Sequence, residues 1–192
     1  MTALESEWLS PPPGGWTLAD VQALPEKCRV EVIDGALIVN PSPLPIHQRV
    51  VRRLAAQLEP QLPPSWQLEY GVDVMLSEDP LDYLTPDIVV FSADVPLTTR
   101  PIPGKQILLV VEVVSRGSRR EDRGAKPLAY AEGGIQHFWR VESPASGALA
   151  IELHAFASDR PGAEYTPAGL YRERLTIGAP FPIDIDLTSL TG

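Results

Sequence analysis

The chain has 192 residues, of which 44% are hydrophobic and 21% charged, which excludes a globally disordered protein and allows a sizeable buried core. Its formal net charge of −9 argues against a protein that coats nucleic acid through overall positive charge, although a local basic site is compatible with it. The single cysteine, Cys28, excludes an intrachain disulfide bond and a zinc site built from cysteines.

Targeting and membrane segments are not recognisable in the sequence. The first residues include Glu5 and Glu7, and no long apolar run follows them, which argues against a signal peptide. The longest uninterrupted apolar run covers 107–111, whereas a membrane helix needs about 20 apolar residues. We therefore expect a cytoplasmic protein with no membrane partner.

The beginning of the chain predicts a lead-in and a hairpin. Residues 1–28 form the lead-in, which contains a proline- and glycine-rich stretch and then a short helix capped by Thr17. The segment Val30–Val39 predicts a β-hairpin that turns at Asp34-Gly35, because this dipeptide suits the positive φ of a tight hairpin turn.

A helix and an alternating segment follow the hairpin. Apolar residues at every fourth position predict a helix over 46–59, with His47 on its apolar face. Residues 66–76 alternate between apolar and polar, which predicts one long strand or two strands with a kink at Gly71.

The rest of the chain predicts a mixed α/β domain. A short strand over 85–91 precedes a strand over 107–115 that is apolar on both faces, which is typical of a central strand covered by helices. A helix over 119–132 should end at Gly133-Gly134, with Pro127 either in its first turn or at a kink. Further β segments are predicted at 135–141, 148–157, 163–171 and 173–187.

Glu112 is the most informative single residue, because it lies within an apolar strand. A buried carboxylate without a partner is costly or becomes protonated, so a cation is expected beside it. That cation is either a protein side chain, such as an arginine in a core ion pair, or a metal ion.

Asp87 opens the strand that follows Pro86, and by itself it is typical of a solvated carboxylate at a strand edge. Neighbouring strands can nevertheless bring Asp87 and Glu112 to the same end of a sheet. There they could share Mg²⁺ or Mn²⁺, with the backbone carbonyl of Val113 as a third ligand.

Lys126 lies four residues after Asp122 on the predicted helix. It either forms a surface ion pair with Asp122 or holds its ammonium near the metal, where it stabilises an attacking hydroxide or the charge on phosphorus. A basic run precedes it and forms either a solvated face or a contact with a nucleic-acid backbone. The run comprises Arg116, Arg119, Arg120 and Arg123.

The ordered set of motifs over about residues 28–142 resembles the putative restriction endonuclease family, a bacterial branch of the PD-(D/E)XK nuclease superfamily. The matching segments are Val32-Ile33-Asp34-Gly35, Pro41-Ser42-Pro43 followed by His47-Gln48, Pro86-Asp87, Val111-Glu112-Val113-Val114-Ser115, and 122–126 followed by Tyr130.

This resemblance implies an α/β fold with a restriction-endonuclease-like αβββαβ core and a mixed sheet, together with an N-terminal β-hairpin and a β-rich C-terminal extension. A single nuclease-like domain is then expected over 29–192, with its core at about 29–142 and the extension over 143–192. The resemblance also implies hydrolysis of phosphodiester bonds with a divalent metal.

The resemblance assigns Asp87 and Glu112 as the metal carboxylates. The superfamily lysine, two residues after the glutamate, is replaced here by Val114, which makes Lys126 the candidate for its role. Asp122 is a further candidate site residue. Two interpretations stay open for each of the two remaining polar positions. His47 is a core histidine or, by resemblance, a ligand or base, and Glu31 is an exposed strand carboxylate or an outer metal ligand.

We predict an endonuclease that depends on Mg²⁺ or Mn²⁺, acts on nucleic acid with DNA as the expected substrate, and forms a homodimer through its extension. Val114 and the acidic net charge favour an alternative, a catalytically inactive binding or regulatory module with the same fold. A metal-dependent hydrolase of a small phosphoester is the third interpretation.

Overall fold

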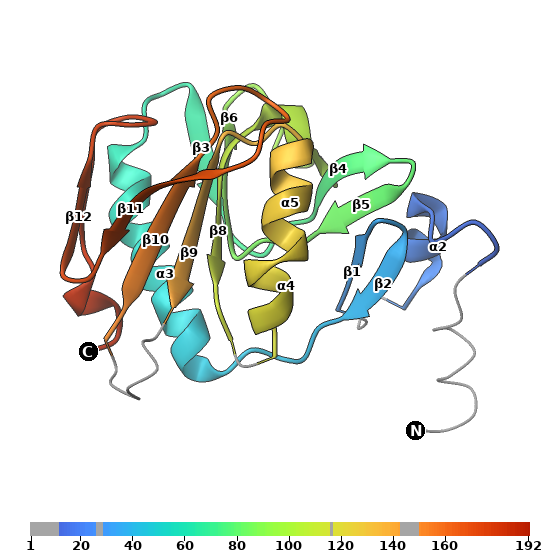
Figure 1. The fold of residues 1–192 in the computed structure, drawn as a ribbon, viewed down its shortest axis with the longest axis horizontal. Coiled ribbons are helices and arrows are strands. Elements are labelled where there is room, and N and C mark those ends of the chain that lie inside the picture. Colours follow the sequence, from blue (N-terminus) through green and yellow to red (C-terminus); the bar gives the residue numbers. More distant parts are fainter. Residues whose placement is uncertain (1–11, 26–28, 116, 143–149) are drawn as a thin grey trace.

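A computed structural model describes residues 12–25, 29–115, 117–142 and 150–192 (Figure 1). The described chain forms a six-stranded sheet, a five-stranded sheet and a two-stranded ribbon. No helix within these ranges is long and apolar enough to cross a membrane.

The six-stranded sheet is the centre of the molecule, and its strand order is β11-β10-β9-β8-β6-β3. It is mixed, because β8 and β9 run parallel while the other neighbours are antiparallel. Its strands are β3 (Trp66–Glu69), β6 (Ile88–Ser92), β8 (Ile107–Val113), β9 (His137–Glu142), β10 (Glu152–Ala157) and β11 (Thr166–Tyr171).

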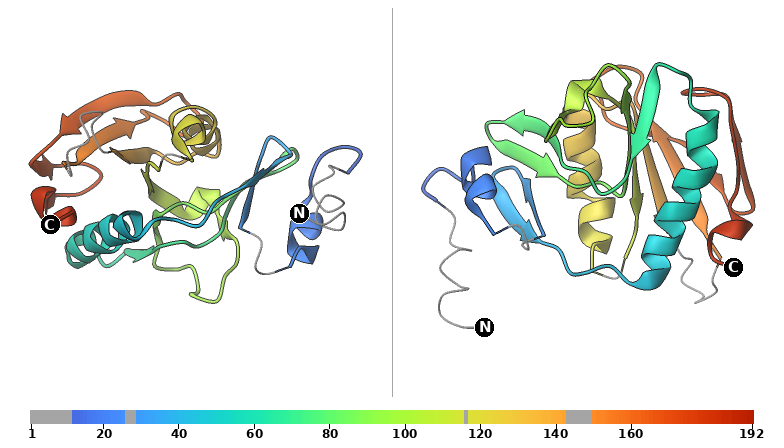
Figure 2. Two further views of the ribbon diagram at one scale, coloured as in Figure 1. Left: turned by 90° about the horizontal axis from the view of Figure 1, so that it is seen from below. Right: turned by 180° about the vertical axis from the view of Figure 1, so that it is seen from behind.

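Helices cover both faces of this sheet. The long helix α3 (Pro45–Leu58) packs on one face, and α4 (Arg119–Arg123) and α5 (Ala125–Glu132) pack on the other, as the front and back views show (Figures 1 and 2). Because side chains alternate along a strand, Val111 of β8 contributes to the core beneath α3 and Val110 to the core beneath α5. Glu112 follows Val110 by two residues, so its side chain also faces α5.

The five-stranded sheet lies beside the central sheet and has the order β2-β1-β5-β4-β7. Its strands are β1 (Val30–Ile33), β2 (Ala36–Val39), β4 (Val74–Glu78), β5 (Leu81–Leu84) and β7 (Ile102–Pro103). The short helix α2 (Leu18–Ala23) begins at a capping box between Thr17 and Asp20, and its Val21 packs on Val32 of β1 in a small core.

The ribbon and three single turns of 3₁₀ helix complete the fold. The ribbon, β12 (Arg174–Ile177) and β13 (Ile183–Asp186), places Leu175 and Ile185 in the core beneath α3. The 3₁₀ turns cover Glu59–Gln61, Gly104–Gln106 and Thr188–Leu190.

The predicted αβββαβ core is present as α3, β3, β6, β8, α4–α5 and β9, in that order along the chain. The predicted hairpin is also confirmed: β1 and β2 pair in register, and Asp34 and Gly35 both adopt positive φ. Of the predicted extension, β10 and β11 continue the central sheet rather than standing apart from it.

The structure differs from the sequence predictions in three elements. The alternating segment 66–76 is divided at Gly71, whose φ is +65°, and its two halves, β3 and β4, belong to different sheets. Strand β5, whose four residues are all buried, was not predicted, because its apolar residues do not alternate. The helix over 119–132 is broken at Gly124, which places Pro127 in the first turn of α5, where proline is tolerated.

Candidate active site

A cavity of about 190 Å³ opens where β6 and β8 approach the N-terminal end of α5 and the hairpin β1–β2. It is lined by six of the predicted site residues: Glu31, His47, Asp87, Glu112, Asp122 and Lys126. These residues come from β1, α3, the start of β6, β8, α4 and α5, so the fold gathers groups that lie far apart in sequence.

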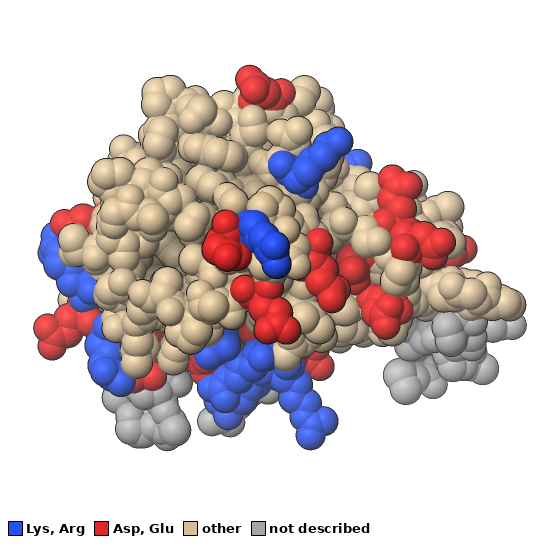
Figure 3. All heavy atoms as spheres, turned by 45° about the horizontal axis from the view of Figure 1, so that its top comes forward, with Lys and Arg blue, Asp and Glu red and all other residues tan. Residues whose placement is uncertain are grey.

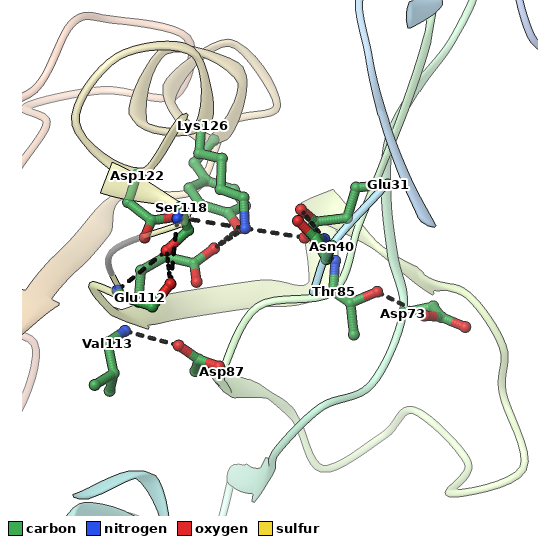
Figure 4. Close-up of polar contacts among 12 residues, drawn as sticks. Glu31, Asn40, Asp73, Thr85, Asp87, Glu112, Val113, Ser118, Asp122 and Lys126 are labelled. Carbon is green, nitrogen blue, oxygen red and sulfur yellow. Dashed lines mark hydrogen bonds and ion pairs between the residues drawn. The ribbon is translucent and has the colours of Figure 1, made fainter. Parts of the chain in front are cut away.

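Lys126 occupies the centre of this group, and its side chain is 6% exposed. Its Nζ lies 3.0 Å from Glu31 Oε1, 3.0 Å from Glu112 Oε1 and 3.6 Å from Asp122 Oδ1 (Figure 4). Burial by itself lowers the pKa of Lys126, but the surrounding carboxylates outweigh burial and raise this pKa above its ordinary value. Lys126 is therefore held as an ammonium ion. Its predicted ion pair with Asp122 is present, but it is buried rather than on the surface.

Glu112 projects from β8 towards α5, where it meets Lys126 and Tyr130. The Tyr130 hydroxyl donates a hydrogen bond of 2.5 Å to Glu112 Oε1, the same oxygen that Lys126 contacts. Burial raises the pKa of Glu112 well above its usual value, Lys126 opposes this shift, and the carboxylates of Asp122 and Asp87 add to it. The cation beside Glu112 is thus a lysine, and the predicted arginine pair does not form among the described residues.

Asp122 is also buried and lies one helical turn before Lys126. Burial raises the pKa of its carboxyl group to about 6, and Lys126 acts in the opposite direction. Within the described residues, Asp122 Oδ1 has no hydrogen-bond partner, although it is buried. A buried carboxylate oxygen of this kind is available to a cation or to a water molecule.

Asp87 lies at the other side of the cavity, where β6 begins. Its Oδ2 accepts a hydrogen bond of 2.7 Å from the backbone N–H of Val113 and lies 3.1 Å from His47 Nε2. The Val113 contact fixes the Asp87 carboxylate against the end of β8, next to Glu112. Burial lowers the pKa of His47, but its contact with Asp87 more than compensates and raises it overall.

Glu31 corrects a prediction, because the sequence favoured an exposed strand carboxylate and this side chain is buried. Its Oε1 accepts a hydrogen bond of 2.9 Å from the backbone N–H of Thr85, and its Oε2 accepts one of 2.7 Å from Asn40 Nδ2. Strand β1 of the hairpin lies beside α5, and Glu31 thereby reaches Lys126 (Figure 4).

The described part of the predicted basic run does not line the cavity. Arg119 and Arg120 are exposed on α4, and Arg123 pairs with Glu142 of β9. Arg116 lies outside the described residues. Positive side chains gather towards the lower edge of the molecule, the side on which α4 lies, while acidic side chains gather beside the smaller sheet (Figure 3). A role for these arginines in binding nucleic acid stays a prediction.

The charges around the cavity suit a divalent cation. Four carboxylates and two cations, Lys126 and Arg29, line it, which leaves a net charge of −2 when all are ionised (−4 + 2). No three His, Cys, Asp or Glu side chains within the described ranges converge as a complete metal-binding group. Mg²⁺ is commonly held by only one or two carboxylates and keeps several waters, so Asp87 and Glu112 fit it.

Sequence reasoning missed the functional importance of three residues that support the charged groups: Asn40, Thr85 and Tyr130. Tyr130 follows Lys126 by four residues and Asp122 by eight, so helical periodicity could have placed all three on one face. Asn40 and Thr85 act on Glu31 through the packing of separate strands, and no local pattern indicates that contact.

Comparisons with known proteins agree with this fold. A family described as "Uma2: Putative restriction endonuclease" matches residues 18–188. The search of curated proteins found no match. The crystal structure of a putative nuclease belonging to DUF820 from Anabaena variabilis ATCC 29413 has a TM-score of 0.65 and 16% sequence identity, over 92% of this chain and 97% of that chain. At this identity the likeness shows a shared fold. Because the family match extends over most of the sequence, the chain belongs to the Uma2 family of putative restriction endonucleases.

Proposed function

We propose that this protein hydrolyses phosphodiester bonds of nucleic acid, with DNA as the expected substrate, and that it uses Mg²⁺ or Mn²⁺. The observation that carries the proposal is a cavity lined by four carboxylates, three of which surround one buried ammonium. The excess of negative charge is costly in a buried site unless a cation compensates it.

Asp87 and Glu112 would hold the metal, and the backbone carbonyl of Val113 is the proposed third ligand. A divalent ion bound there would lower the pKa of a water molecule and polarise the phosphate oxygens. Asp87 is oriented for this role by the Val113 N–H, and Glu112 by Tyr130 and Lys126. In each case the supporting bond fixes one oxygen of the carboxylate.

Lys126 supplies positive charge beside Glu112, although it stands on the helix after β8 rather than on β8 itself. In the proposed reaction its ammonium stabilises the attacking hydroxide or the negative charge that develops on the phosphate. Glu31 positions Lys126, because it accepts one of the three hydrogen bonds that the ammonium can donate. His47 contacts Asp87 and positions it from α3.

One observation favours the alternative of a metal-free binding module. Lys126 already compensates part of the charge of Glu112 and Glu31, so the fold is partly satisfied without a metal. The two functions differ in their need for a divalent ion, which makes metal dependence the deciding measurement.

The test combines cleavage with metal binding. Supercoiled plasmid and single-stranded DNA are incubated with the protein in Mg²⁺, Mn²⁺ or EDTA. The proteins compared are wild type, Asp87→Asn and the matched control Asp94→Asn. The carboxylate of Asp94 is exposed and lies outside the cavity. We expect cutting by wild type and the control with metal only, and its loss in Asp87→Asn. Wild type that neither cuts DNA nor gains thermal stability with Mn²⁺ would favour the binding module.

A further inference from the structure

A second and larger cavity, of about 560 Å³, adjoins the candidate active site. It opens between α2, the hairpin and the loop that contains Arg100. Arg29, Asn40 and Thr85 line both cavities, so the two hollows meet along these residues. A polymer bound in the smaller cavity would therefore have the larger cavity directly beside it.

The two cavities differ in charge. The active-site cavity is acidic, whereas the charged residues that line the larger cavity are Arg29, Arg100 and Asp73, which together carry +1 (+2 − 1). Arg100 is 76% exposed, and its Nε lies 2.6 Å from Asp73 Oδ2. A guanidinium group has five N–H donors, so Arg100 keeps donors for a phosphate while Asp73 holds its position.

A chain of hydrogen bonds connects Arg100 with the catalytic lysine. Asp73 Oδ1 accepts a bond of 2.9 Å from Thr85 Oγ1, and the Thr85 backbone N–H donates to Glu31 Oε1, which also accepts from Lys126 (Figure 4). These bonds fix the arginine relative to the active site. A phosphate held by Arg100 would thus stand in a defined position relative to the bond that is cut.

We propose that the larger cavity holds the nucleotide next to the scissile phosphodiester, and that Arg100 and Arg29 bind the phosphate of this nucleotide. The proposal rests on the proposed function and adds a substrate class to it: one unpaired strand. The volume lies in the range of cavities that enclose single small ligands, which suits one nucleotide rather than a paired duplex.

The walls of the cavity are compatible with a strand that passes through it. Gly71 and Pro101 have no charged side chain, so neither wall residue repels a phosphate backbone. Tyr83 is a buried lining residue, and Asn40 and Thr85 line both cavities.

Salt-dependent binding tests this subsite. The probe is a fluorescein-labelled single-stranded 12-mer of thymidylate in EDTA, and its dissociation constant is measured by anisotropy at several salt concentrations. The variants are Arg100→Ala, Arg29→Ala and the control Arg160→Ala, whose exposed side chain lines neither cavity. Arg29→Ala removes a charge without breaking the bond between Arg100 and Asp73.

For each cavity variant we expect weaker binding at low salt and a slope of log K against log salt that is smaller by about 0.7, the value for one phosphate contact on a single strand. Arg160→Ala should keep the wild-type slope. Equal slopes and affinities for wild type and both cavity variants would overturn the proposed subsite.

Hydrolysis of bis(p-nitrophenyl) phosphate with Mn²⁺ separates this inference from the proposed function. This small diester needs only the active-site cavity. The subsite alone is refuted if wild type hydrolyses this diester but neither Arg29→Ala nor Arg100→Ala changes oligonucleotide binding. Wild type that hydrolyses neither the small diester nor DNA refutes the proposed function, and the subsite with it.

Discussion

Lys126→Met is the most demanding test of the charged centre, because it removes the ammonium and keeps most of the side-chain volume. Three carboxylates, those of Glu31, Glu112 and Asp122, then face one another without their shared cation. Removal of one partner from a buried ion pair costs about 3–5 kcal/mol, and we expect a loss of this size in the free energy of unfolding at pH 8.

The same substitution should cost less in acid. Burial raises the pKa of Asp122 to about 6 and that of Glu112 above its usual value, so both groups take up protons as the pH falls. Protonation removes the repulsion that the missing ammonium would have balanced, so the difference between variant and wild type should shrink at pH 5.

Urea unfolding followed by circular dichroism at pH 5 and pH 8 measures both effects. Lys105→Met is the matched control, because Lys105 is exposed in a 3₁₀ turn and lines neither cavity. The electrostatic account of the centre is refuted if Lys126→Met and Lys105→Met unfold with the same free energy at pH 8, or if the loss is unchanged between the two pH values.

Three further predictions concern single contacts. Tyr130→Phe should lower the free energy of unfolding by about 1.5–3 kcal/mol, because the buried hydroxyl of Tyr130 donates a hydrogen bond to a carboxylate. Tyr165→Phe loses only a bond to the Ile135 carbonyl and should lower it by about 0.5–1.5 kcal/mol. Equal losses in urea titrations would contradict this difference. Asp122→Asn should gain stability relative to wild type as the pH rises from about 4 towards 6. In that window the folded wild type binds more protons than its unfolded chain, so the wild type loses stability as the pH rises. A difference in unfolding free energy between variant and wild type that stays constant from pH 4.5 to 7 would argue against this. Gly35→Ala should lower the free energy of unfolding by about 1–2 kcal/mol, because φ at Gly35 is +69°. At Gly178 an added Cβ meets open space, so Gly178→Ala should have little effect in the same titration.

Local patterns predicted much of the fold and part of the site. The Asp34-Gly35 turn and the spacing within α3 depend on neighbours in sequence, so the hairpin and the helix could be recognised directly. Glu112 could be recognised as buried because apolar residues flank it on one strand. Its direct pairing with Lys126 was not predicted, because the sequence placed Lys126 either beside Asp122 or near a metal ion; the pairing follows from the packing of α5 on β8.

The features that were not predicted depend on contacts between distant segments. Glu31 looks like any strand carboxylate until the hairpin packs beside α5, and its burial is a property of that arrangement. The division of 66–76 between two sheets likewise depends on which strands β3 and β4 find as neighbours. Alternation along the chain indicates a strand but not the sheet to which it belongs.

The bond between Glu31 and Lys126 joins residues that are 95 positions apart and belong to different structural layers. A fragment limited to the αβββαβ elements would keep Asp87, Glu112 and Lys126 and yet lose one wall of both cavities. The smallest portion of this chain suitable for engineering the active site therefore has to include the hairpin. Transplanting the three charged residues onto another nuclease scaffold would reproduce the composition of the site without the environment that sets its charge.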